Sequence, residues 1–79
     1  MALIISNDFK YMGKERHSVH KSTAATYSSF YMYGKRYFQI DTYGSKDRKV
    51  PEKISQSIQI NEEMAKILVD LLKREFNIH

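Results

Sequence analysis

The fold is decided by residues 34–60, which read GKRYFQIDTYGSKDRKVPEKISQSIQI. Aromatic and branched residues at 36–43 are typical of a β-strand, and residues 54–60 alternate between isoleucine and polar positions. Two strands are therefore expected, joined by a basic loop at 45–53 that holds the only proline, Pro51. Asn61 is a good helix N-cap, and apolar residues follow it at spacings of three and four.

The segments before residue 34 complete the predicted architecture. Residues 2–6 form a short apolar run, residues 14–26 read as a basic loop, and residues 27–33 alternate up to a turn at Gly34–Lys35. The chain is thus predicted to be one α+β domain with an antiparallel sheet of about four strands arranged as a meander, and a C-terminal amphipathic helix packed on one face. The expected divisions are 1–26 for the N-terminal strand and loop, 27–60 for the β-meander and 61–77 for the helix.

The positive charge is concentrated in the β part of the chain. The net charge is +4, and residues 1–60 carry ten Lys/Arg against five Asp/Glu, while residues 61–79 carry three against four. A basic surface of this kind favours polyanions such as nucleic acid. The absence of cysteine excludes a disulfide framework and thiolate metal sites. The apolar run after Met1 is too short for a signal peptide or a membrane span, so a cytoplasmic location is expected.

Strand alternation predicts a face rich in tyrosine, opposite the apolar side chains of the sheet. Tyrosine rings stack with the bases of single strands, hydroxyl and amide groups bind base edges, and Lys and Arg bind phosphates. The face is expected to carry Tyr27, Tyr31, Tyr33, Tyr37 and Tyr43. The predicted nucleic-acid contacts are Tyr31, Tyr37, Tyr43, Lys35, Arg36, Lys46, Arg48, Lys49, Lys53, Ser57 and Gln59.

Other kinds of site are weighed against this one. A tyrosine-rich face also suits a protein interface. Asp41, Asp47 and Glu52, with Lys49 or Lys53, could form the metal site of a nuclease. The His-x-x-His pair at 17 and 20 supplies too few ligands for a metal. Since no nucleophile motif or glycine-rich phosphate loop is present, the chain is predicted to be non-catalytic, with no cofactor and no metal.

The segment 34–76 resembles the transcriptional positive cofactor four family of single-stranded-DNA-binding proteins and its bacterial relatives. The features that match are the Gly34–Lys35 turn, the strand 37–40 followed by Tyr43, the Pro51-Glu52-Lys53 loop, the strand 57–60 and the acidic start of an apolar helix. The resemblance implies a curved antiparallel sheet, a helix-mediated dimer and a concave face that binds single strands. The contacts that it implies are Lys35, Tyr37, Lys49, Lys53, Ser57 and Gln59. Two departures are Asp41, where the family tends to place a basic residue, and Glu52, where it has glycine.

The sequence therefore predicts non-catalytic binding of single-stranded nucleic acid, with DNA favoured, in the regulation of transcription, replication or repair. The expected partner besides nucleic acid is a second copy, held through the C-terminal helix. The alternative is a small protein-interaction module, or a phage or mobile-element regulator that binds a protein. A metal-dependent nuclease is the third hypothesis.

Overall fold

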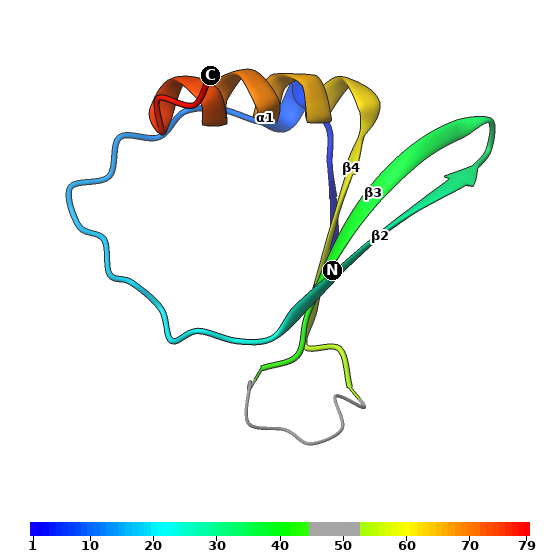
Figure 1. Cartoon of the computed structure of the whole chain (residues 1–79), viewed down its shortest axis with the longest axis horizontal. Coiled ribbons are helices and arrows are strands. Elements are labelled where there is room, and N and C mark those ends of the chain that lie inside the picture. The colour runs from blue at the N-terminus through cyan, green and yellow to red at the C-terminus, as the bar shows by residue number, and fades with distance from the viewer. Residues whose placement is uncertain (45–52) are drawn as a thin grey trace.

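The computed structural model of the chain describes residues 1–44 and 53–79, and within them four strands form one sheet, which a helix follows (Figure 1). The strands lie in the spatial order β1-β4-β3-β2. This arrangement confirms the predicted α+β class. In chain order the elements are β1 (Ala2–Ile4), the short 3-10 helix η1 (Ser6–Asp8), β2 (Ala25–Met32), β3 (Lys35–Thr42), β4 (Gln56–Asn61) and α1 (Glu62–Glu75).

The expected all-antiparallel meander is wrong at β1, because this strand pairs with β4 in parallel. The chain leaves β1 at the end of the sheet where α1 begins, and the Ser6 hydroxyl of η1 donates to Glu63 Oε1 at 2.9 Å. Residues 9–24 then form no helix or strand, bow away from the sheet and return to its opposite end, where β2 starts (Figure 1). This return path gives β1 and β4 the same direction.

The predicted helix signals are confirmed, although the helix is shorter than the expected 61–77. The Asn61 side chain accepts a hydrogen bond from the Met64 backbone N–H at 2.9 Å, which is N-cap geometry. Lys73 and Arg74 lie in the last turn, where they complement the helix dipole. The backbone of Asn77 adopts φ 53°, a left-handed conformation that commonly follows a helix end.

A two-residue turn joins β2 and β3, and it lies one residue earlier than predicted. The turn residues are Tyr33 and Gly34, with φ of 55° and 74°, so that both are left-handed as a type I′ hairpin requires. Met32 and Lys35 form the pair that closes it. The resulting hairpin curves away from the sheet and projects on the side away from the C-terminal end of α1 (Figure 1).

The register of this hairpin corrects the predicted tyrosine face. Phe30 lies opposite Tyr37, and Tyr27 lies opposite Ile40, so the tyrosines of β2 share a face with the apolar residues of β3. A two-residue turn pairs even-numbered residues of one strand with odd-numbered residues of the other, and paired residues share a face. The prediction instead placed the odd-numbered residues of both strands on the same face. The five tyrosines therefore do not share one face. We call the two faces the Gln39 face (Phe30, Tyr37, Gln39, Asp41, Ser57, Gln59) and the Ile40 face (Tyr27, Ser29, Tyr31, Arg36, Phe38, Ile40, Ile58, Ile60).

The helix covers only one end of the Ile40 face. A small cavity between α1 and the sheet is lined by Ala65 and, among others, by Phe38 and Ile60. Further along the same face Ile40 and Ile58 are each 42% exposed. Within the described residues, Met64 is the single hydrophobic side chain that is fully buried. The helix therefore closes a small core and leaves much of the apolar face uncovered.

In residues 1–44 and 53–79, no helix has both the length and the apolar character needed to cross a bilayer.

Candidate nucleic-acid interface

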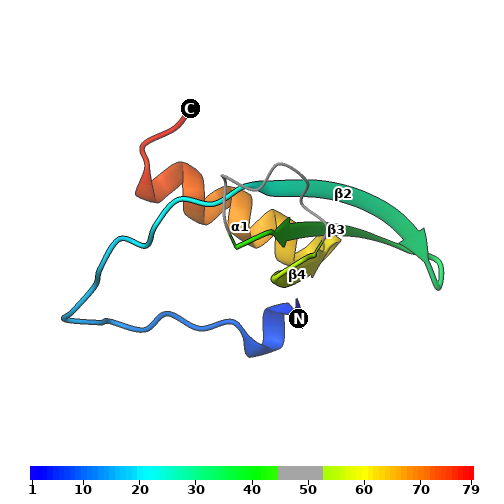
Figure 2. The same cartoon turned by 90° about the horizontal axis from the view of Figure 1, so that it is seen from below.

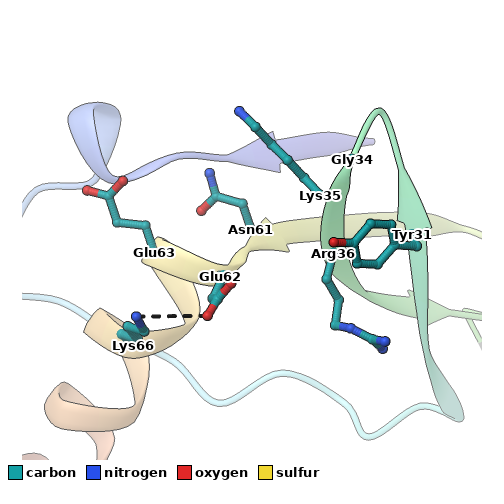
Figure 3. A pocket seen from close by; sticks show the side chains of 8 residues that line it. All are labelled: Tyr31, Gly34, Lys35, Arg36, Asn61, Glu62, Glu63 and Lys66. Atoms are coloured by element: carbon teal, nitrogen blue, oxygen red, sulfur yellow. Dashed lines mark ion pairs between the residues drawn. The ribbon is translucent and has the colours of Figure 1, made fainter.

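The tip of the β2–β3 hairpin gathers exposed aromatic and basic side chains within six residues. Tyr31 and Tyr33 are exposed, and so are Lys35 and Arg36 directly after the turn. Their elements fix their directions, because successive side chains of a strand point to opposite faces. In Figure 3 the Lys35 and Arg36 side chains accordingly leave the hairpin on opposite sides. A strand of nucleic acid that met this tip would therefore find a cation on either side of it.

Tyr33 is the most unusual residue of the tip. It is 89% exposed and has φ 55°, a conformation that asparagine, aspartate or glycine adopts at much lower cost. Asn-Gly is the preferred pair for such a turn, and the chain has Tyr-Gly instead. Local stability therefore does not account for a tyrosine at this position, and an exposed aromatic ring at a hairpin tip is a candidate contact residue.

Arg36 and Tyr31 face each other across the hairpin. They form a cross-strand pair, and the guanidinium carbon of Arg36 lies 5.7 Å from the centroid of the Tyr31 ring. This separation allows a cation–π contact, which holds the two side chains beside one another. The pair presents an aromatic face and a cation together, the combination that a base and its phosphate require.

An open hollow separates the hairpin tip from the start of α1 (Figure 3). Its hairpin side carries the two basic residues of the tip, whereas its helix side carries Glu62 and Glu63. Lys66 also lines it and forms an exposed ion pair with Glu62 at 3.8 Å. Since Glu62 and Glu63 bring two negative charges to its helix side and like charges repel, the hollow does not favour a phosphate inside it. Any phosphate contact is expected on the outer side of the tip.

The Gln39 face carries a connected row of polar side chains across β3 and β4. The Gln59 amide donates to Gln39 Oε1 at 2.7 Å, and the Gln39 amide donates to Asp41 Oδ1 at 2.8 Å. The Ser57 hydroxyl donates to the same Asp41 oxygen at 2.5 Å. We call these four residues the Asp41 network. Ser57 was predicted to contact nucleic acid, but its side chain is buried and its hydroxyl proton is already donated to Asp41.

Two other predicted contacts, Tyr37 in β3 and Tyr43 directly after it, also interact with neighbouring side chains. Tyr37 is half-buried and stacks on Phe30, with ring centroids 5.4 Å apart. The Tyr43 hydroxyl lies 2.8 Å from that of Thr26. These contacts hold β2 against β3, and Tyr37 and Tyr43 are less exposed than Tyr31 and Tyr33. Tyr33 belongs to the predicted tyrosine face but not to the predicted contacts, and its place beside the predicted Gly34–Lys35 turn was the signal that could have added it.

The predicted basic residues are not brought together. Lys35 and Arg36 lie at the hairpin tip. Lys53 precedes β4 at the other end of the sheet, because Gln56 at the start of β4 pairs with Thr42 at the end of β3. The remaining predicted cations, Lys46, Arg48 and Lys49, lie outside the described residues.

Asp41, one of the residues weighed for a metal site, has hydrogen-bond partners of its own in the described part of the chain. Asp41 is engaged by Ser57 and Gln39, and Asp47 and Glu52 are outside the described residues. No group of three histidine, aspartate or glutamate residues within 1–44 and 53–79 is placed to hold a metal ion. His17 and His20 lie in the extended segment 9–24.

Comparison with known proteins gives no relative: no family model matches the chain, and no curated protein or solved structure does so. The resemblance to the positive cofactor four family therefore stays a prediction from the sequence.

Proposed function

We propose that the chain binds single-stranded nucleic acid, with the tip of the β2–β3 hairpin as its main contact. The observation that carries the proposal is Tyr33, an exposed ring in a left-handed turn position, two residues from Lys35 and three from Arg36. A flat ring accepts any base, and each base stacked on an aromatic side chain contributes about 1–3 kcal/mol. The two cations supply the phosphate contacts.

The contact set is smaller than the sequence suggested. Tyr31, Tyr33, Lys35 and Arg36 form it, while the Asp41 network supports the sheet from which the hairpin projects. With no array of base-specific groups at the tip, binding is expected to show little sequence preference. With two phosphate contacts for each hairpin, affinity is expected to be modest and to fall as salt rises.

The proposal is tested by titrating a labelled oligo-dT with the protein at several salt concentrations. Replacing Lys35 and Arg36 together by glutamine is expected to weaken binding and to reduce the slope of log affinity against log salt by about 0.7 for each lost phosphate contact. Lys73→Gln, in the last turn of α1, is the matched control and is expected to leave the slope unchanged. No binding at low salt, or equal slopes for the wild type and the hairpin variant, would contradict the proposal.

A protein-interaction module is the second candidate, and the uncovered Ile40 face favours it. Apolar side chains exposed side by side on a sheet are typical of a surface that another protein covers. The two candidates differ in their salt response, because an apolar contact does not weaken as salt rises. A purified protein that ignores oligo-dT and is retained by a partner from nuclease-treated lysate would support this candidate.

A further inference from the structure

The chain leaves far more surface exposed than a compact monomer of its mass does. Its accessible surface is 7507 Å², whereas a compact protein of the same 9.3 kDa mass exposes about 5,000 Å². Exposed apolar side chains include Ile40 and Ile58 on the Ile40 face and Val69 and Leu72 on α1. The four strands and the helix therefore do not close into a compact monomer, and the parts of the sheet left open are candidates for contact with another chain.

The sheet also ends in an edge that the described residues leave unpaired. β2 lies at one end of the strand order, and Figure 2 shows β2, β3 and β4 following one another toward the N-terminus. The Tyr43 backbone N–H donates to the Ala24 carbonyl at 3.1 Å, so even-numbered residues of β2 exchange hydrogen bonds with β3. By alternation, the backbone N–H and C=O groups that point to the free edge are those of Ala25, Tyr27, Ser29 and Tyr31.

This edge lacks the features that keep exposed strands apart. β2 reads ATYSSFYM, without a charged residue or a proline, and its register with β3 runs unbroken through eight residue pairs with no bulge. Natural edge strands are usually protected by lysine, proline, a bulge or a short length. An eight-residue edge with none of these is a surface that another strand is expected to join.

We infer that a second copy of this chain pairs with the free edge of β2, antiparallel and about a two-fold axis near the middle of the strand. A second copy fits because the edge is neutral, so that identical strands meet without repulsion, and because an antiparallel strand pair is self-complementary. The pairing joins two four-stranded sheets into one of eight strands and sets the two Ile40 faces side by side. This contact differs from the helix-mediated dimer that the sequence predicted.

A single introduced cysteine tests the pairing, because the chain has none of its own. Ser29→Cys places an exposed thiol near the two-fold axis, and a thiol-specific cross-linker with a short spacer is expected to join two copies rapidly. Ser18→Cys, exposed in the segment 9–24, measures linkage by random collision. Val69→Cys measures contact through α1. Linkage of S29C no faster than that of S18C, or linkage of V69C alone, overturns the inference.

The mass in solution gives a second measure that does not require the cysteine variants. Sedimentation equilibrium of the wild type is expected to give twice 9.3 kDa. Ser29→Lys is expected to give 9.3 kDa with its strand signal in circular dichroism retained, since the backbone of this residue does not bond to β3. A wild-type monomer across micromolar concentrations, or an S29K variant that stays dimeric, overturns the inference. No nucleic acid is added, so these results are independent of the proposed binding.

Discussion

The Ser57 hydroxyl donates its hydrogen bond to the carboxylate of Asp41 across the β3–β4 pair, where both residues are only 8% exposed. A carboxylate in such a place requires donors, because burying an unpaired charge costs several kcal/mol. Gln39, itself held by Gln59, supplies a second donor to the same oxygen. Asp41, which fitted the predicted binding face poorly, is therefore part of the structure that holds β3 to β4.

Removing the Ser57 hydroxyl is expected to destabilise the fold. Ser57→Ala leaves the buried carboxylate with one donor fewer and is expected to lower the free energy of unfolding by about 1–3 kcal/mol. Urea denaturation at a fixed protein concentration measures the change. Ser28→Ala is the control, since Ser28 lies on the same face opposite Gln39 but is exposed, and a change within about 0.5 kcal/mol is expected there. Equal losses at the two serines would contradict this account.

The N-cap of α1 gives a second prediction. Asn61→Ala removes the acceptor of the Met64 N–H and is expected to cost about 1 kcal/mol. In a chain of this size that loss lowers the midpoint of thermal unfolding by about 4–8 °C. Asn61→Asp retains the cap and is expected to melt close to the wild type. If the aspartate variant melted as early as the alanine variant, the cap would not be the cause.

Gly34 tests the hairpin geometry. Gly34→Ala places a β-carbon on a residue with φ 74° and is expected to cost about 1 kcal/mol. An added β-carbon there meets no atom within 4 Å, so the cost is conformational and not a clash. Gly13→Ala is the control, because its backbone is outside the left-handed region and its new contact with Tyr11 is at an ordinary 3.5 Å. A Gly34 variant as stable as the Gly13 variant in urea would contradict the type I′ turn.

The sequence predicted the elements well and their arrangement less well. Local chemistry was enough to predict the Asn61 cap, because a cap depends on its neighbours in the chain. Alternation within each strand was enough to put Gln39 and Gln59 on a common face, because β3 and β4 pair odd-numbered residues with odd-numbered residues. The parallel position of β1 was not predictable in the same way, since it depends on where residues 9–24 return the chain.

The predicted site was wrong about which face of the sheet carries the tyrosines on either side of the hairpin turn. Carrying the alternation through the turn put Tyr31 and Tyr37 on one face, whereas the two-residue turn at Tyr33 and Gly34 inverts the relation. The burial of Ser57 could not be predicted either, because strand periodicity gives the face on which a side chain lies and not whether neighbouring side chains enclose it. Only the hairpin tip, where sequence neighbours are also spatial neighbours, was predictable as a cluster.

The central claim is that Tyr33 occupies the hairpin turn for binding and not for stability. Tyr33→Asn separates the two roles, because asparagine suits the left-handed turn better than tyrosine and cannot stack a base in the same way. Unfolding in urea and titration of labelled oligo-dT at low salt are measured on the same preparations. The variant is expected to be at least as stable as the wild type and to bind roughly 5- to 150-fold more weakly, corresponding to about 1–3 kcal/mol. Unchanged affinity in a stable variant would contradict the claim.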